Sequence, residues 1–181
     1  ISLADALKNS LNTVAVQLQD KVGFDPIIAM ANNLGIGNKR PLGRYYPMAI
    51  GAYEQTVLDM TAAYSAVTNR GVYVKPTAFE EIRGPGGDVL WSRRVDGDRG
   101  KRAMDSDVAD TMNWMLQRVV SGGTGIAAKL DDRPVAGKTD SKILGFRLPI
   151  VSIPISKFFP NEELILVSPT VPLSNYTPFQ K

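Results

Sequence analysis

The sequence predicts a protein that combines helices and strands, because both segments with helical periodicity and short strand-like runs occur along residues 1–139. Three segments carry apolar residues three or four positions apart, which is the spacing of one helix face. Two apolar runs flank the turn sequence Gly-Pro-Gly-Gly-Asp at 84–88, a pattern that predicts a β-hairpin. A third run, at 134–136, predicts a buried strand that leads directly to a Lys-Thr pair.

The composition is that of a globular protein. The chain has 181 residues, enough for one domain with a sizeable core, and 44% of them are hydrophobic and 22% charged. With 21 basic and 18 acidic residues the net charge is only +3, which argues against nucleic acid as the main partner.

Cysteine and histidine are both absent from the sequence. A thiolate nucleophile, a disulfide, a Ser-His-Asp triad and a histidine-based metal site are therefore excluded within these residues. Acid–base chemistry near neutral pH must come from Lys, Asp, Glu or Tyr. We predict no metal and no cofactor.

No signal peptide opens the sequence, and no apolar run reaches the roughly 20 residues of a membrane span. The first residues resemble the middle of a helical pattern. We therefore expect a fragment of a longer protein.

The first predicted helix extends from Leu3 to Val22 and is stopped by Gly23. It contains the tripeptide Ser10-Leu11-Asn12. Its apolar face consists of Leu3, Leu7, Leu11, Val14, Leu18 and Val22.

Two further helices have start signals. Asp25 is the expected N-cap of the second helix, with Pro26 in its first turn, and Gly35 ends it. Thr56 and Asp59 resemble a capping box for the third helix, with Asp in place of the usual Glu.

Strands are expected at 72–74, 79–83 and 89–91, followed by a polar loop at 96–102. Asp105 or Ser106 should cap a fourth helix. Its predicted inward residues are Val108, Met112, Met115, Leu116 and Val119.

The composition changes after residue 141. Residues 142–181 hold six of the 12 prolines but only one of the 16 glycines, and prolines interrupt their apolar runs. We therefore predict a partial domain at 1–139 and a tail of different character at 140–181.

Two short pairs of residues are candidates for chemistry. Ser10 and Asn12 can project from one helical turn, where a hydroxyl can relay a proton and a carboxamide can hold a carbonyl or a lysine. Lys138 can bind an anion or control the pKa of a nearby hydroxyl through its charge. Thr139 can donate a hydrogen bond to a carboxylate. Either pair alone is also compatible with solvated polar residues at a helix face or a strand end.

The order of several segments makes the candidates more specific. The run at 6–18 resembles the Ser-x-Asn helix of penicillin-binding protein transpeptidase domains, especially the bifunctional class A type. Val135-Ala136-Gly137-Lys138-Thr139 resembles that family's strand with a Lys-Thr-Gly motif. Further similar segments lie between them, in the family's order, at 47–51, 56–64, 69–71, 75–76, 115–120 and 123–128.

The resemblance implies an α/β, penicillin-binding/β-lactamase-like transpeptidase fold, in which helices flank an antiparallel sheet, here incomplete. It implies serine acyl transfer on D-Ala-D-Ala stem peptides. By position, Ser10 would assist proton transfer to the leaving group and Asn12 would orient the substrate. Lys138 and Thr139 would bind the substrate carboxylate, with Ser141 as a further substrate-binding residue.

The same resemblance implies the surroundings of the protein. Its partners would be peptidoglycan stem peptides and β-lactams, without nucleic acid. A glycosyltransferase domain and a membrane anchor would precede this segment, and the site would face the periplasm on the extracytoplasmic side of the bacterial membrane.

Three departures from the family pattern count against activity. The family's nucleophilic Ser-x-x-Lys motif is absent from the 181 residues, Asp140 stands where the family has Gly, and no Trp-Phe-x-Gly strand follows. Asp140 would crowd the substrate groove and oppose a carboxylate. Residues 140–181 are explained either by divergence or by a frameshift after Thr139. If one lost base is restored before the Asp140 codon, that codon becomes one for Gly. In the restored frame, the codons of residues 143–146 can encode Asp-Thr-Trp-Phe, a sequence that the family carries there.

Three interpretations follow. The first is a transpeptidase fragment that is inactive alone. The second is a non-catalytic scaffold module for cell-wall assemblies, which the missing Ser-x-x-Lys and Asp140 favour. The third is a relative of serine β-lactamases or carboxypeptidases, for which Ser-Asp-Asn would be more typical than Ser10-Leu11-Asn12.

Overall fold

The structure is a computed structural model that describes residues 1–38, 40–139, 151–153 and 163–166. Its α-helices are α1 (Leu3–Lys8), α2 (Asn12–Val22), α3 (Phe24–Asn33), α4 (Val57–Thr68), α5 (Arg93–Asp96) and α6 (Ser106–Gly122). Two short 3-10 helices are η1 (Tyr46–Ile50) and η2 (Ile126–Ala128). The strands are β1 (Val72–Tyr73), β2 (Glu81–Arg83), β3 (Val89–Ser92), β4 (Lys101–Arg102), β5 (Val135–Ala136), β6 (Val151–Ile153) and β7 (Glu163–Leu166).

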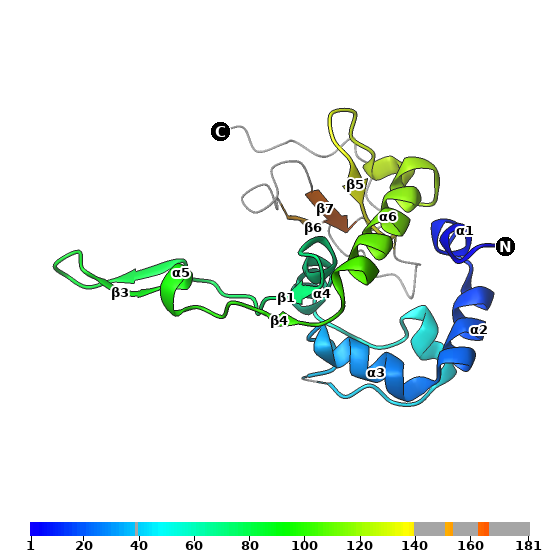
Figure 1. The fold of residues 1–181 in the computed structure, drawn as a ribbon, viewed down its shortest axis with the longest axis horizontal. Helices are drawn as coiled ribbons and strands as arrows, with labels where there is room; N and C mark the ends of the chain where they lie inside the picture. Colours follow the sequence, from blue (N-terminus) through cyan, green and yellow to red (C-terminus); the bar gives the residue numbers. More distant parts are fainter. Residues whose placement is uncertain (39, 140–150, 154–162, 167–181) are drawn as a thin grey trace.

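Helix α6 lies at the centre of the fold, where it contacts α1, α4 and β5 (Figure 1). Leu116 of α6 packs with Val67 of α4 and Ala136 of β5. On the next turn Val120 packs with Val135 and Ala128. These contacts place the C-terminal end of β5 beside α6, which is the end from which the Lys-Thr pair extends.

The strands form three small sheets. β1 pairs with β4 and β2 pairs with β3, both antiparallel. β5 lies parallel to β7, which in turn is antiparallel to β6. The predicted strands near 72–74, 79–83 and 134–136 are thus present in shortened form, and the strand predicted at 89–91 extends to Ser92.

The first predicted helix is wrong in one important respect. The chain leaves helical geometry after Lys8 and resumes it at Asn12, so the tripeptide Ser10-Leu11-Asn12 spans a break between α1 and α2. The helical spacing of the leucines continues across the break, and for that reason the pattern did not reveal it.

Helix starts differ in how well they follow the sequence signals. The Thr56 hydroxyl accepts from the Asp59 backbone N–H at 3.0 Å, so this cap is confirmed. For α3 the predicted N-cap is wrong, because the helix begins at Phe24 and Gly23, at φ 86°, occupies the N-cap position in place of Asp25. Pro26 does lie in the first turn, and the helix ends before Gly35. Helix α6 does follow Asp105, although the Asp105 side chain makes no capping hydrogen bond.

Two expectations about the second half of the chain need correction. Val108 and Met112 of α6 were expected to face inward but are 52% and 37% exposed, whereas Ala109, which was not predicted, is fully buried. The polar loop at 96–102 contains β4, which pairs with β1. The lysine and arginine of β4 carry no apolar signal, so only the long-range pairing defines this strand.

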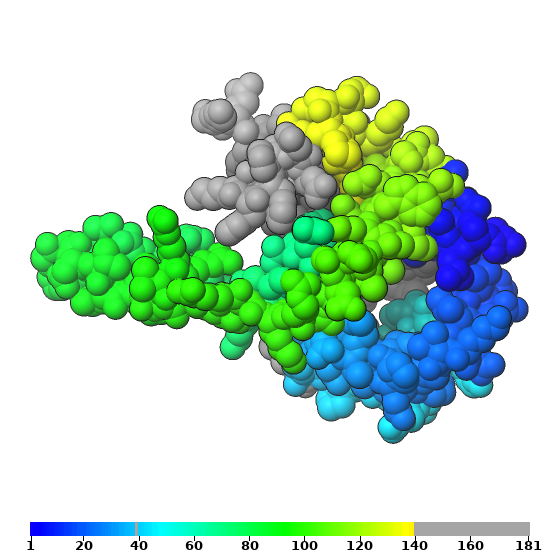
Figure 2. Space-filling view, in the orientation of Figure 1, coloured from blue at the N-terminus to red at the C-terminus, as the bar shows by residue number. Residues whose placement is uncertain are grey.

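The β2–β3 hairpin projects from the body of the molecule as an arm (Figure 2). Its strands pair Ile82 with Trp91 and are joined through the predicted Gly-Pro-Gly-Gly-Asp turn. Phe79 and Leu90 on this arm are exposed. The arm lies away from β5, so it does not contribute to the candidate site described below.

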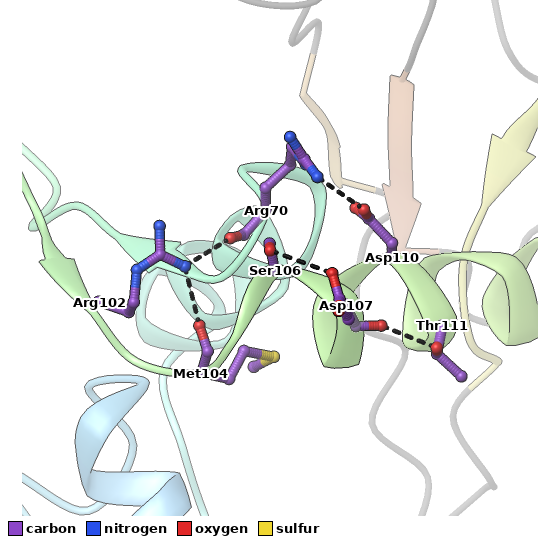
Figure 3. Close-up of polar contacts among 7 residues, drawn as sticks. All are labelled: Arg70, Arg102, Met104, Ser106, Asp107, Asp110 and Thr111. Atoms are coloured by element: carbon purple, nitrogen blue, oxygen red, sulfur yellow. Dashed lines mark hydrogen bonds and ion pairs between the residues drawn. The ribbon is translucent and has the colours of Figure 1, made fainter.

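A junction of side-chain contacts connects the end of α4 with α6 (Figure 3). One guanidinium nitrogen of Arg102 donates to the carbonyls of Arg70 and Met104, at 3.2 Å each. The Arg70 guanidinium forms an ion pair with Asp110 of α6 at 3.1 Å. The end of α4 is thereby joined to the approach to α6 through Arg102 of β4, and to α6 itself through the ion pair between Arg70 and Asp110.

Helix α1 is tied to α6 by an ion pair, in which the Arg118 guanidinium donates to the Asp5 carboxylate at 3.0 Å. The Ser2 hydroxyl also donates to Asp5, at 2.7 Å. The Ser2 hydrogen bond and then the Arg118 hydrogen bond hold the pKa of Asp5 below its ordinary value of 3.8. The folded state therefore prefers the ionised carboxylate.

This preference predicts a pH dependence of stability. Because the pKa of Asp5 is lowered on folding, its contribution is complete above about pH 4 and is lost as the pH falls toward the lowered value. The Tm difference between the wild-type chain and Asp5→Asn should be largest at neutral pH and disappear in strong acid. A Tm difference that stays constant from neutral to acid pH would contradict the assignment.

Candidate functional site

The structure brings together two of the predicted motifs, which lie 128 residues apart in the sequence. The Lys138 ammonium donates to the Ser10 hydroxyl at 2.8 Å. The same ammonium donates to the backbone carbonyl of Thr139 at 2.9 Å. Ser10, Lys138 and Thr139 are all half-buried. A cation, a hydroxyl and a second hydroxyl-bearing residue thus meet where α1 approaches the end of β5.

Ser10 reaches Lys138 because α1 ends in a left-handed turn. The Leu11 N–H donates to the Ala6 carbonyl at 3.0 Å and the Ser10 N–H donates to the Leu7 carbonyl at 3.1 Å. Ser10 has a φ of 55°. These are the two hydrogen bonds of a Schellman C-cap, with Ser in the position that usually holds Gly. Ser10 therefore projects from a helix end and not from a helix face.

The left-handed conformation of Ser10 should lower the stability of the folded chain. A non-glycine residue in this region costs roughly 1–2 kcal/mol. We expect Ser10→Gly to raise the free energy of unfolding by up to about 1 kcal/mol, since glycine relieves the strain but adds unfolded-state entropy. Denaturant titration of the chain measures this change. The matched variant Ser121→Gly, within helix α6, should instead destabilise.

Lys138 owes its position to the burial of β5. Val135 and Ala136 are 5% and 4% exposed, and the Gly137 N–H donates to the Leu116 carbonyl of α6 at 3.4 Å. The strand is therefore anchored on α6 up to Gly137. Lys138 is the first residue beyond the anchor that can extend toward Ser10.

Thr139 has a partner that sequence reasoning did not identify as a site residue. Its hydroxyl lies 2.7 Å from the hydroxyl of Thr124, in the loop that follows α6. The backbone N–H of Thr124 donates to the carbonyl of Lys8, at the end of α1. The Gly-Thr-Gly sequence after α6 contributed to the family resemblance. Nothing in that sequence indicated that Thr124 would contact Thr139.

The other predicted residues stand differently. Asn12 is the first residue of α2 and is exposed, two positions after Ser10 in the chain. Asp140 and Ser141 lie outside the described residues. Of the predicted set, the structure therefore joins Ser10, Lys138 and Thr139.

The arrangement can support proton transfer and anion binding. Because the Ser10 oxygen accepts a hydrogen bond from Lys138, the hydroxyl hydrogen of Ser10 can be donated to another group. The adjacent ammonium favours any negative charge that develops on that oxygen. A substrate carboxylate near Lys138 and Thr139 would receive charge-assisted hydrogen bonds.

Other kinds of site find no support in the part of the chain that the structure describes. There, no group of three or more acidic residues is arranged to hold a metal ion. Within the same residues, no helix has the length and apolar character needed to cross a membrane.

A cavity of about 270 Å³ lies on another face of α6 and β5. Trp114, Arg118, Lys129, Arg133 and Val135 are among the residues that line it, and the Arg118 guanidinium lies 5.2 Å from the centre of the Trp114 ring. The lining includes neither Ser10 nor Lys138. The cavity and the candidate site are therefore separate features.

Comparison with known sequences shows that this chain is similar to penicillin-binding proteins. The family model described as the penicillin-binding protein transpeptidase domain matches residues 1–140. Penicillin-binding protein 1A of Aquifex aeolicus is 35% identical over 159 residues, which cover 84% of this chain and 21% of that protein. Penicillin-binding protein 1A of Streptococcus oralis is 35% identical over 147 residues, covering 77% and 22%. The chain thus spans about a fifth of the length of these relatives.

Solved structures give the same result for the fold. The D,D-transpeptidase domain of a peptidoglycan glycosyltransferase from Eggerthella lenta superimposes with a TM-score of 0.66 at 26% identity, covering 76% of this chain and 41% of that one. Penicillin-binding protein 1A from Haemophilus influenzae gives a TM-score of 0.63 at 19% identity, covering 70% and 24%. At that identity the second likeness concerns the fold alone.

Proposed function

Because this chain belongs to the penicillin-binding protein transpeptidase family, we propose that it supplies the Ser-x-Asn and Lys-Thr part of a D,D-transpeptidase site. The fold class predicted from the sequence is confirmed, because a solved transpeptidase domain superimposes on this chain. The reaction would cross-link peptidoglycan through serine acyl transfer from D-Ala-D-Ala stem peptides. The observation that carries the proposal is the 2.8 Å hydrogen bond from Lys138 to Ser10.

The proposed roles follow from which groups donate and accept. A nucleophilic serine adds to the carbonyl carbon of the penultimate D-Ala and gives up its proton, the C–N bond breaks, and the leaving amine of the last D-Ala takes up a proton. An amine of a neighbouring strand then attacks the resulting serine ester, forms the cross-linking amide bond and returns a proton to the serine. Ser10 is placed to deliver that proton, because Lys138 holds its oxygen and leaves its hydrogen for donation. Lys138 and Thr139 would bind the terminal carboxylate, and Asn12 would orient the peptide.

The nucleophile itself must come from outside these 181 residues, since they contain no Ser-x-x-Lys motif. We propose that a segment with this motif completes the site in the full protein, together with a glycosyltransferase domain and a membrane anchor, on the extracytoplasmic side of the membrane. β-Lactams would acylate that serine. The chain alone would then be inactive.

The proposal can be tested with a chimaera. In Aquifex aeolicus penicillin-binding protein 1A, the matching segment is replaced by residues 1–139 of this chain, so that the relative supplies the remainder of the domain. The chimaera should be labelled by fluorescent penicillin, and the 181-residue chain alone should not be. A folded chimaera that is not labelled would contradict the proposal.

The scaffold interpretation is distinguished by one more residue. A second chimaera carries residues 1–140 and thus includes Asp140, whose charge should oppose the substrate carboxylate. Labelling of the first chimaera but not of the second would show a transpeptidase segment impaired by Asp140. If neither chimaera is labelled although both are folded, the non-catalytic scaffold becomes the better explanation.

A further inference from the structure

We propose that Thr124 is a positioning residue of the site: its hydroxyl donates to the Thr139 hydroxyl and thereby directs the Thr139 hydrogen toward the substrate carboxylate. The inference rests on the proposed function, in which Thr139 binds that carboxylate. It assigns a role to the loop after α6, which contains none of the predicted site residues.

The direction of the hydrogen bond follows from counting hydrogens. The two hydroxyl oxygens are 2.7 Å apart, an ordinary distance for one O–H···O bond, and either could be the donor. Each hydroxyl has a single hydrogen. If Thr139 donates to a bound carboxylate, it has no hydrogen left for Thr124, so Thr124 must be the donor between them. The three groups then form a chain in which each bond strengthens the next.

The backbone around Thr124 is fixed closely enough for this role. The Thr124 N–H donates to the Lys8 carbonyl at 3.2 Å, and the Gly125 N–H donates to the Val119 carbonyl at 3.0 Å. A Cβ on Gly123 would lie 2.4 Å from the Lys8 carbonyl oxygen, so this approach of the loop to α1 requires glycine. The loop therefore contacts the end of α1, just before Ser10, and also Thr139.

A purely structural role explains the hydroxyl of Thr124 less well. Thr124 is exposed, and so is the hydrogen bond between the two hydroxyls. Water can replace an exposed hydroxyl contact in the folded chain, so its contribution to stability is small. The backbone contacts of the loop, which do fix the fold, do not involve the hydroxyl. The side chain is therefore better explained by the orientation of Thr139.

The test compares Thr124→Val with Thr124→Ser in the chimaera that carries residues 1–139. The second-order rate of acylation is measured with benzylpenicillin and with its methyl ester, which lacks the free carboxylate. Thr124→Val should lower the rate for benzylpenicillin by about 3- to 10-fold, the effect of one hydrogen bond, and leave the rate for the ester unchanged. Thr124→Ser should restore the wild-type ratio of the two rates.

A matched control comes from helix α6, which precedes the loop of Thr124. The Thr111 hydroxyl donates to the Asp107 carbonyl at 2.7 Å, near the opposite end of α6, so Thr111→Val should leave both rates unchanged. Equal losses with benzylpenicillin and the ester in Thr124→Val would indicate a general disturbance and overturn the inference. Wild-type rates with both compounds in Thr124→Val would overturn it too.

A second measurement separates this inference from the proposed function and uses the 181-residue chain itself. The Cβ chemical shift of Thr139 should move in Thr124→Val but not in Thr124→Ser or Thr111→Val. If the wild-type chimaera is not labelled by penicillin, the proposed function fails, whereas this shift still reports on the hydroxyl pair. A Thr139 signal that does not move in Thr124→Val would overturn the positioning role.

Discussion

Lys138→Met in the chimaera is expected to lower the rate of penicillin acylation by about 10²- to 10³-fold, the usual effect of removing one preorganised donor from an acyl-transfer site. The variant keeps the length of the side chain but loses the ammonium that donates to Ser10 at 2.8 Å. Ser10 would lose the charge that favours proton relay, and the substrate carboxylate would lose its cation. Stopped-flow or quenched labelling with benzylpenicillin measures the rate.

Two controls make this result specific. Lys129→Met removes an exposed lysine from the separate cavity and should leave the rate unchanged. Lys138→Arg keeps the charge but replaces a compact ammonium by a planar guanidinium, so it should recover only part of the rate. If Lys138→Met is acylated as fast as wild type, Lys138 has no part in the reaction and the assignment of the site is wrong.

Gly71→Ala should be the most destabilising of the substitutions considered, with a loss of about 2–4 kcal/mol in the free energy of unfolding. Gly71 has a φ of +85°, and a Cβ there would lie 2.2 Å from the Met104 backbone oxygen. The Ala103 N–H donates to the Gly71 carbonyl at 2.8 Å, so the two backbone segments cannot separate without losing that bond. Denaturant unfolding of the 181-residue chain measures the loss.

Gly87 provides the matched control, because its φ is +86° but a Cβ there would meet nothing within 4 Å. Gly87→Ala should therefore cost only the conformational term of about 1–2 kcal/mol. The difference between the two variants isolates the close approach of Gly71 to Met104. Equal losses would mean that the junction between α4 and α6 gives way easily and does not fix the two helices.

Much of the fold was accessible from local sequence signals. The cap formed by Thr56 and Asp59 and the hairpin turn at 84–88 depend on residues close together in the chain, and the structure contains both. The strand at 134–136 was recognisable because short apolar runs between turn residues are typical of buried strands. Strand β4 was not, since Lys101 and Arg102 form a strand only through their pairing with β1.

The break between α1 and α2 shows why periodicity alone misplaced a candidate residue. Leu7 and Leu11 keep a helical spacing, yet the chain turns between them. A glycine at position 10 would have signalled the C-cap, but serine stands there and has a φ of 55°. The contact with Lys138 explains what a serine can do at that position that a glycine cannot.

By itself, the sequence determined the third and fourth predicted helices and the hairpin, the absence of histidine and cysteine chemistry, and the two pairs of candidate residues, because these depend on composition, spacing and motif order. Only the tertiary structure decided that Ser10 and Lys138, 128 positions apart, are hydrogen-bonded, and that Thr124 contacts Thr139. The physical reason is that α6 packs against both α1 and β5. Such packing depends on side chains distant in sequence, which no local pattern records.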